Sequence, residues 1–410
     1  MGTKRILLIG ATTGYQTRAF AEAGEVLGYS IMLATDRCHV LDDPWGDRAI
    51  ALRFEDPQLA AETLAANASA DGIVALGDRP AYIAALTAQR LGLRYNSPES
   101  VFACRNKFLA HQRFEEAGLM VPQFYRAALA DGAEKAVSQA RFPCVLKPLG
   151  LSASRGVIRA NNRREFLAAF RRIEALLGDP DIVRLREEQD RFLQVEDFID
   201  GREFALEGIL SSGQLSVLAI FDKPDPLDGP YFEESIYVTP SRHPAAVQRE
   251  IIRTTEAAIR ALGLAHGPIH AEMRVNQRGV WMLEVAARPI GGLCARVLPG
   301  LELLIIRHAA GEGVTGLAMP ALAQGVMMIP IPAEGIYVAV SGLNEAQSTP
   351  GVEEIIITAK QGQKLVPLPE GNSYLGFIFA RGDSPEFVEA ALRMGHSRLQ
   401  FEIATALPVV

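Results

Sequence analysis

Residues 270–292 read HAEMRVNQRGVWMLEVAARPIGG and have the pattern of two strands joined by a tight turn at Asn276–Gly279. Hydrophobic and polar side chains alternate along both arms, which is typical of a hairpin with one buried face. The alternation predicts an apolar face and an opposite face that carries two glutamates. The predicted apolar face contains Ala271, Met273, Val275, Trp281, Leu283 and Val285, and the opposite face contains His270, Glu272, Arg274, Met282, Glu284 and Ala286.

The two glutamates of this hairpin indicate a metal site. A turn centred on Arg278 places Glu272 directly opposite Glu284, and like charges in such a pair destabilise a sheet unless a cation lies between them. Two converging carboxylates are typical ligands of a hard divalent cation such as Mg²⁺. Arg288 follows on the same face and is suited to hold a phosphate or acyl-phosphate oxygen. From spacing alone, a surface hairpin with two solvated glutamates explains the pattern equally well.

Composition indicates a globular protein of several domains. The chain has 410 residues, enough for two to four domains. A net charge of −7 argues against non-specific nucleic-acid binding. The four cysteines form no C-x-x-C pair and are expected to be reduced thiols of a cytoplasmic protein. No signal peptide is predicted at the start, and prolines interrupt the apolar stretch 326–340, so we expect no membrane span.

The first 97 residues alternate between strand and helix patterns, which predicts a doubly wound parallel sheet. The Gly10–Gly14 turn lacks the G-x-G-x-x-G spacing, so we expect it to close the edge of a neighbouring site rather than to bind a nucleotide by itself. The predicted strands are 5–10, 30–34 and 72–76, and the predicted helices are 15–28, 57–68 and 79–92.

The sequence pattern of the remaining residues predicts two further domains. A helix at 98–117, capped by Ser97, opens a central domain that ends with the hairpin, and a polar, mobile excursion is expected at 178–191. From about 311, short strands separated by Gly/Pro turns precede a last helix and strand, which is an α+β pattern. We therefore expect an α/β and α+β chain divided into an N-terminal domain 1–97, a central domain 98–310 with a lid at about 125–200, and a C-terminal domain 311–410.

An anion site is indicated around Lys147. Its ammonium, at the end of the apolar strand VLKP, is unfavourable when buried without an anion, although a snorkelling lysine is the better explanation in isolation. The loop GLSASRG at 150–156 follows, and its small residues allow backbone N–H groups to approach a phosphate. A plain hairpin turn is the alternative for this loop.

The segment VEDFIDGRE at 195–203 places two glutamates seven residues apart. The backbone from Glu196 to Phe198 is suited to the edge of an adenine ring, and the Glu203 carboxylate to ribose hydroxyls. The alternative is a pair of solvated acids beside an Asp-Gly turn. Lys107 could add a second charge to the phosphates, although a solvated helical lysine is the simpler explanation.

The order of these motifs resembles that of the ATP-grasp superfamily of carboxylate–amine ligases, over about residues 100–300 in motif detail. The resemblance implies ATP and Mg²⁺ as cofactors, with Mn²⁺ as an alternative. It implies that Lys107 and Lys147 bind the phosphates and that loop 152–157 closes over them. It implies that Glu272 and Glu284 hold two metal ions and that Lys147 and Arg288 act in catalysis. The residues that it implies for nucleotide binding are Lys107, Lys147, Ser152, Ser154, Arg155, Gly156, Glu196, Phe198 and Glu203.

One position departs from the common pattern. Most members read E-x-N-x-R on the second arm, with the Asn as a metal ligand, whereas this chain has Ala286 there. The E-x-A-A-R form resembles the L-amino-acid (dipeptide) ligase branch, as do residues 229–242, 350–352 and 376–380. The resemblance implies an ATP-dependent ligase of EC 6.3 type, in which a carboxylate forms an acyl phosphate that an amine then attacks.

The substrates are less clearly indicated. An α-amino group requires a carboxylate, and Glu233 or Glu234 is a candidate, with at most one facing inward because they alternate. His270 lies beside Glu272 and is a candidate for substrate contact, or else a core histidine; Lys223 and Arg242 are left unassigned. We expect small-molecule substrates, no nucleic-acid or membrane partner, and allow for a homodimer. The alternatives are a purine-pathway or biotin-carboxylase-like ligase, or a non-catalytic nucleotide-binding protein.

Overall fold

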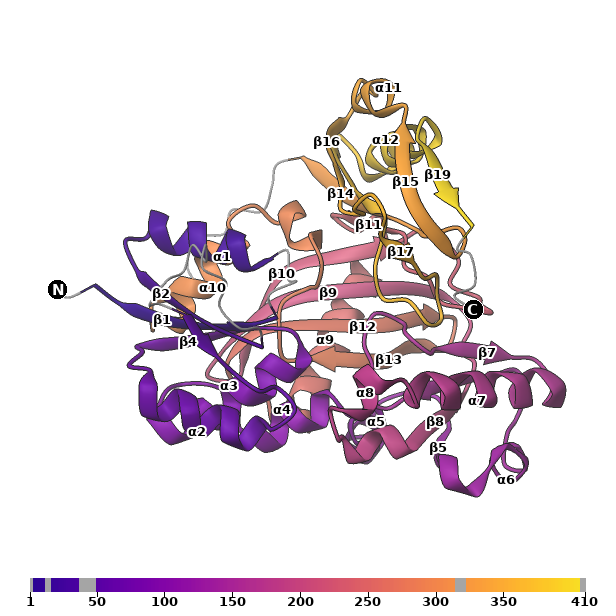
Figure 1. Ribbon diagram of the computed structural model, residues 1–410, viewed down its shortest axis with the longest axis horizontal. Coiled ribbons are helices and arrows are strands. Elements are labelled where there is room, and N and C mark those ends of the chain that lie inside the picture. Colours follow the sequence, from indigo (N-terminus) through magenta and orange to yellow (C-terminus); the bar gives the residue numbers. More distant parts are fainter. Residues whose placement is uncertain (1–2, 12–15, 37–48, 314–321, 406–410) are drawn as a thin grey trace.

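The computed structural model describes residues 3–11, 16–36, 49–313 and 322–405. Gly14, the predicted helix start at 15 and Cys38 lie outside the described residues. In Figure 1 the N-terminal domain is at the left in indigo, the C-terminal part is at the upper right in yellow, and the lid is at the lower right. No helix among the described residues is long and apolar enough to cross a membrane.

The N-terminal domain contains the predicted doubly wound parallel sheet. Its four strands lie in the order β3-β2-β1-β4 and all pairs are parallel. Side chains alternate between the two faces, so Leu7 and Ile9 pack in the core on one face and Ile6 and Leu8 in the core on the other. The elements are β1 (Arg5–Gly10), α1 (Gln16–Val26), β2 (Ser30–Thr35), β3 (Ala49–Ala51), α2 (Pro57–Asn67), β4 (Gly72–Leu76) and α3 (Asp78–Leu91).

The helix predicted at 98–117 is in fact two helices, α4 (Pro98–Cys104) and α5 (Lys107–Glu116). The predicted cap is present, since Ser97 accepts a hydrogen bond from the Ser100 amide at 3.1 Å. The break occurs because Asn106 caps a new helix, its side chain accepting from the Leu109 amide at 3.1 Å. Lys107 is therefore the first residue of α5.

The region predicted to be a lid contains a four-stranded antiparallel sheet in the order β5-β8-β6-β7. Helix α7 packs on it through Phe166, Phe170 and Ile173, which are buried. The lid elements are β5 (Phe124–Ala128), η2 (Leu129–Asp131), α6 (Ala133–Val137), β6 (Cys144–Pro148), β7 (Ile158–Ala160), α7 (Arg163–Leu177), α8 (Pro180–Val183), η3 (Glu188–Arg191) and β8 (Phe192–Asp197).

The segment 178–191, predicted to be a mobile excursion, is instead anchored to the N-terminal half of the chain. It contains α8 and η3, and Glu187 between them accepts hydrogen bonds from Arg79 at 2.5 Å and Arg105 at 2.8 Å. The prediction was wrong because polar side chains of the segment form ion pairs across a domain contact. Composition alone does not distinguish such paired side chains from side chains in water.

A third sheet, of eight strands, forms the centre of the molecule, in the order β13-β12-β9-β10-β11-β14-β18-β16 with antiparallel neighbours. It runs through the domain boundary predicted at 311, since β11 pairs with β14. Its elements are β9 (Arg202–Ser211), β10 (Gln214–Lys223), β11 (Ile236–Thr239), α9 (Ala245–Leu262), β12 (Gly267–Asn276), β13 (Gly279–Ala286), η4 (Cys294–Val297), α10 (Leu301–Ala309), β14 (Ala323–Ile329), β16 (Val352–Ile357) and β18 (Gly376–Gly382).

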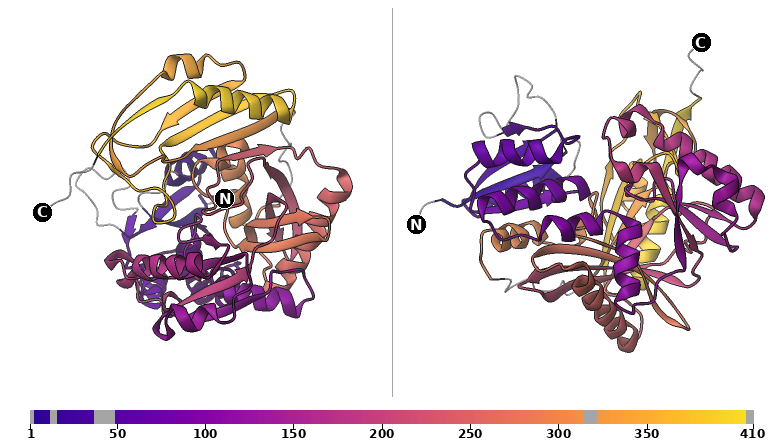
Figure 2. Two further views of the ribbon diagram at one scale, coloured as in Figure 1. Left: turned by 90° about the vertical axis from the view of Figure 1, so that its right-hand side faces the viewer. Right: turned by 90° about the horizontal axis from the view of Figure 1, so that it is seen from below.

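The C-terminal part completes the α+β arrangement with the predicted last helix and strand. A three-stranded sheet, β17-β15-β19, lies beyond the eight-stranded sheet. Figure 2 shows this yellow part separate from the N-terminal sheet. The elements are β15 (Gly335–Ser341), α11 (Leu343–Gln347), β17 (Lys364–Leu365), α12 (Pro385–Ser397) and β19 (Gln400–Ala404).

The opening hairpin is present as β12 and β13, but its faces differ from the prediction. Glu272 pairs with Glu284 whereas Met273 pairs with Met282, so Leu283 is an extra residue, a β-bulge. The bulge reverses the alternation beyond it: Met282 is in the core, and Leu283 lines a cavity. Trp281 pairs with Arg274 on the other face. A two-residue turn plus a bulge thus produces the predicted pairing of the two glutamates.

Gly72→Ala should destabilise the protein by about 1–3 kcal/mol, the usual range for overpacking. A Cβ atom on Gly72 would lie 2.2 Å from the carbonyl oxygen of Ala309, so β4 and α10 would have to separate. The measurement is the midpoint of urea denaturation. Gly313→Ala is the control, because a Cβ atom there meets no heavy atom of the described residues within 4 Å. Equal stability of the two variants would contradict the close packing of α10 on the N-terminal sheet.

Candidate active site

A cavity of about 460 Å³ lies where the domains meet, which is within the size range of small-molecule sites. The N-terminal domain contributes Asp78, the lid contributes Lys147, the hairpin contributes Glu272 and Glu284, and the C-terminal part contributes Tyr374. Ala11 and Gln16 also line it. Residues 12–15 of the predicted Gly10–Gly14 turn lie outside the described residues, so its expected place beside the cavity stays a prediction.

The hairpin glutamates lie near lysines from two other elements. Lys223 approaches Glu272 at 3.2 Å, and Lys107 approaches Glu284 at 3.4 Å. Each carboxylate therefore has a cation beside it, which offsets the repulsion between the pair. Both glutamates line the cavity. Carboxylate oxygens that face a cavity are a donor set that fits Mg²⁺.

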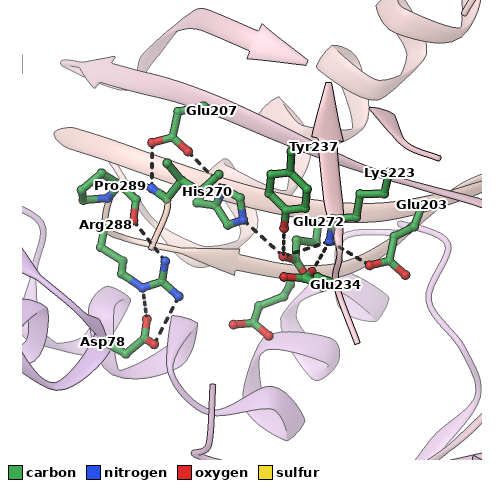
Figure 3. Close-up of polar contacts among 12 residues, drawn as sticks. Asp78, Glu203, Glu207, Lys223, Glu234, Tyr237, His270, Glu272, Arg288 and Pro289 are labelled. Carbon is green, nitrogen blue, oxygen red and sulfur yellow. Dashed lines mark hydrogen bonds and ion pairs between the residues drawn. The ribbon is translucent and has the colours of Figure 1, made fainter. Parts of the chain in front are cut away.

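His270 lines the cavity and is held between two glutamates. Its Nδ1 lies 3.0 Å from Glu207 and its Nε2 lies 3.2 Å from Glu272, as Figure 3 shows. Burial disfavours the imidazolium, but the two carboxylates outweigh burial and raise the pKa of His270 to about 9. His270 pairs across the strands with Ala286, which does not line the cavity. Glu272 is therefore supported by His270 as well as by Lys223.

Glu207 is a site residue that sequence reasoning missed. It is fully buried on β9, and its second oxygen accepts a hydrogen bond from the Ile290 amide at 3.0 Å. Burial raises its pKa. The available signal was a single acid inside the apolar run FALEGIL, since a buried carboxylate without partners is unfavourable.

Lys223, which the sequence left unassigned, lies at the centre of three carboxylates. Its ammonium is 2.9 Å from Glu203 and 3.2 Å from Glu272, and it also donates to Glu234 (Figure 3). Burial opposes its charge, but these acids hold the pKa of Lys223 above its usual value. Glu234 lines the cavity and Glu233 does not, in agreement with their predicted opposite orientation. Burial and the neighbouring Glu272 raise the pKa of Glu234 to about 7.

The predicted E-x6-E pair is buried and paired, which excludes the alternative of two solvated acids. Glu196 contacts Lys147 at 2.5 Å and accepts a hydrogen bond from Gln194 at 2.7 Å. Burial alone would raise its pKa, but Lys147 and His111 hold the pKa of Glu196 below its usual value. Glu203 is bound by Arg274 at 3.0 Å as well as by Lys223. Both glutamates line the cavity, together with Phe198.

The small-residue loop contacts both the cavity and the C-terminal part of the chain. Ser152 and Ser154 line the cavity, as predicted for a phosphate loop. Arg155 and Gly156, which were predicted to contact the nucleotide, instead face the C-terminal part: the Arg155 side chain donates to the Glu370 carbonyl and the Gly156 amide to the Pro369 carbonyl, both at 2.7 Å. Val157, which follows Gly156, lines the cavity again, so the loop contacts both the cavity and the C-terminal part.

Arg288 is oriented by an acid of the N-terminal domain. Its Nε lies 2.9 Å from Asp78, and a second guanidinium nitrogen lies 3.4 Å from the other carboxylate oxygen. Burial opposes the charge, but Asp78 raises the pKa of Arg288. Sequence reasoning missed Asp78, although it begins α3 directly after β4, at the carboxyl end of a parallel sheet where ligands usually bind.

Two families of known domains match the chain. Residues 140–297 match the ATP-grasp domain, and residues 327–404 match the L-amino acid ligase C-terminal domain 2. A D-alanine–D-alanine ligase from Geotalea uraniireducens is 32% identical over 230 residues, which cover 55% of this chain and 67% of the relative. The chain spans between 45% and 67% of the length of the first three curated relatives it matches.

Solved structures share the fold over nearly the whole chain. An L-amino acid ligase from Bacillus licheniformis has a TM-score of 0.84 and 26% identity, covering 99% of this chain and 100% of that one. A phosphoribosylglycinamide synthetase from Anaerococcus prevotii has a TM-score of 0.69 and 16% identity, covering 98% and 100%. The second likeness concerns the fold alone.

Glu207→Gln should lower the pKa of His270 by at least one unit from about 9. The variant removes one of two carboxylates that favour the imidazolium and leaves the burial that opposes it. The measurement is an NMR titration of histidine side chains without metal. A raised pKa stabilises the fold below about pH 6.5, the ordinary histidine value, and this contribution is lost as the pH rises through 9.

Glu302→Gln, on α10, is the matched control for this titration because no contact joins Glu302 to His270. The control should leave the His270 pKa unchanged. An unchanged pKa in Glu207→Gln would show that Glu207 does not support the imidazolium.

Proposed function

The chain belongs to the ATP-grasp superfamily of carbon–nitrogen ligases, and from this premise we propose that it joins the carboxylate of an amino acid to an amine through an acyl phosphate. ATP supplies the phosphoryl group, and ADP and phosphate leave.

The observation that carries the proposal is the composition of the cavity wall. Lys147 and Glu272 lie within the segment that matches the ATP-grasp domain, and Met328 and Tyr374 lie within the segment that matches the L-amino acid ligase C-terminal domain 2. All four line one cavity. A ligand that occupies it would therefore contact the nucleotide-binding and the C-terminal segments together.

In the first step, a carboxylate oxygen attacks the γ-phosphorus of ATP, and the bond from that phosphorus to the bridging oxygen of ADP breaks. Such a transfer depends on positioning and charge neutralisation. Lys107, Lys147 and the hydroxyls of Ser152 and Ser154 supply donors for the phosphates. Glu272 and Glu284 would hold Mg²⁺, which neutralises phosphate charge when bound.

In the second step, the amine nitrogen attacks the acyl carbon, the carbon–oxygen bond to phosphate breaks, and the amine loses a proton. Arg288 faces the cavity and is oriented by Asp78, so it is suited to stabilise the oxyanion that develops on the acyl oxygen. No covalent enzyme intermediate is required.

Among the candidate substrate residues, Glu234 is favoured over Glu233 and His270. Glu234 lines the cavity, and an α-ammonium group would be a suitable partner for its carboxylate. Both ring nitrogens of His270 already face carboxylates, so we assign it to the support of Glu272 instead.

The two alternative functions have less support. The likeness to purine-pathway and carboxylase structures is at 14–16% identity and concerns the fold, whereas the C-terminal match is to L-amino acid ligases. A non-catalytic nucleotide-binding protein would not need Lys147, Glu272, Glu284 and Arg288 to converge on one cavity.

Glu284→Ala should abolish ADP formation, a loss of about 100-fold or more, while the protein stays folded. The variant removes one of two proposed metal ligands, and the charge of the transferred phosphoryl group is then less well neutralised. The measurement is ADP formation with near-UV circular dichroism as the test of folding. Glu402→Ala, at an exposed position on β19, is the control. Full activity of Glu284→Ala would contradict the metal assignment.

Phosphate release from ATP should require a pair of amino acids. A panel of single and paired L-amino acids, with bicarbonate as a separate arm, is scored by phosphate release and by mass spectrometry of the products. A dipeptide mass is the expected result. Stimulation by bicarbonate, with none by any amino acid, would favour a carboxylase-like function instead.

A further inference from the structure

Three carboxylates of the site satisfy the spacing of a metal centre. Oxygen atoms of Glu203, Glu234 and Glu272 lie within 4.8 Å of one another, and no other group of three potential ligands among the described residues does so. They come from β9, from the segment before β11 and from β12. Yet only Glu272 belongs to the metal pair proposed above, so the triad requires a separate explanation.

The explanation lies in the ammonium group that the three acids share. Lys223 contacts all of them, and its side chain is 3% exposed. Its backbone position is fixed beside one of them, because Lys223 pairs with Glu203 across β10 and β9. The ring of Tyr237 lies 5.0 Å from the ammonium and encloses it further. A cation that belongs to the protein therefore already lies among the three carboxylates.

Two more cations border the same acids. Arg274 donates to Glu203 at 3.0 Å, and His270 contacts Glu272 at 3.2 Å. Among the described residues, Lys223 is the one cationic side chain that forms an ion pair with Glu234. A divalent ion bound among these acids would face the ammonium at short range in a buried site, where repulsion between like charges is strong.

We propose that Lys223 is a resident counter-cation that excludes divalent metal ions from the Glu203–Glu234–Glu272 triad. The proposal rests on the proposed function for the location of the catalytic metal. Exclusion from the triad confines that metal to the other side of Glu272, toward Glu284. It also leaves Glu234 free of metal, so that its carboxylate can receive the ammonium group of a substrate. Lys223 thus acts as a positioning residue that determines where the metal binds.

The first test is Mn²⁺ binding to the full chain without nucleotide or substrate, followed by electron paramagnetic resonance. Lys223→Met should bind one more Mn²⁺ per chain than the wild type, because the triad loses its cation and keeps its ligands. Lys223→Arg retains a positive charge and should bind as the wild type does. Equal stoichiometry and affinity in wild type and Lys223→Met would overturn the proposal.

A second variant keeps the proposal testable if Lys223→Met does not fold. Glu234→Gln preserves the shape of the side chain, and in the presence of Lys223 it should change Mn²⁺ affinity by less than about two-fold. A loss of ten-fold or more would place the ion in the triad and overturn the proposal. A wild-type chain that binds no Mn²⁺ under these conditions agrees with a triad closed by Lys223.

These measurements are independent of catalysis. A chain that forms no dipeptide but shows the extra Mn²⁺ in Lys223→Met would contradict the proposed function and support the role of Lys223. A chain that forms a dipeptide but loses its bound Mn²⁺ in Glu234→Gln would support the proposed function and contradict the role of Lys223.

Discussion

The constraint on which the site depends is the burial of several carboxylates close together. Such groups are tolerated only when cations or hydrogen-bond donors compensate them. Glu272 has Lys223 and His270 beside it, and Glu284 has Lys107. These cations come from β10, β12 and α5, so the two partly buried acids are compensated only if separate parts of the chain meet at one place. Charge compensation therefore couples the site to the arrangement of the domains.

The same requirement links the domains at the edges of the cavity. Asp78 of the N-terminal domain binds Arg288, which follows the hairpin. Glu187 of the lid binds Arg79, the neighbour of Asp78. On the opposite side, Arg172 of the lid donates to Glu370 at 2.8 Å. The cavity is thus bounded by ion pairs between domains, which determine the position of the reactive groups relative to one another.

Much of the fold was predictable, because hydrophobic periodicity is a local property. The three predicted N-terminal strands were confirmed to within one residue and the helices to within two over the described residues, whereas β3 was not predicted. The errors occurred where a local signal was ambiguous: Asn106 caps a second helix within 98–117, and the bulge at Leu283 reverses the faces of the hairpin. The polar segment 178–191 was misinterpreted because a polar side chain that pairs across a domain contact has the same composition as one in water.

By itself, the sequence determined the order of the chemical groups: Lys107, Lys147 with its small-residue loop, the E-x6-E pair, and the paired glutamates with Arg288. Each of these is a short pattern whose geometry follows from strand and helix periodicity. Only the tertiary structure decided which partners those groups have. Asp78 and Arg288 are 210 residues apart, and Glu207 and His270 are 63 apart. No local pattern relates residues at such separations, because their contact depends on how whole sheets pack together.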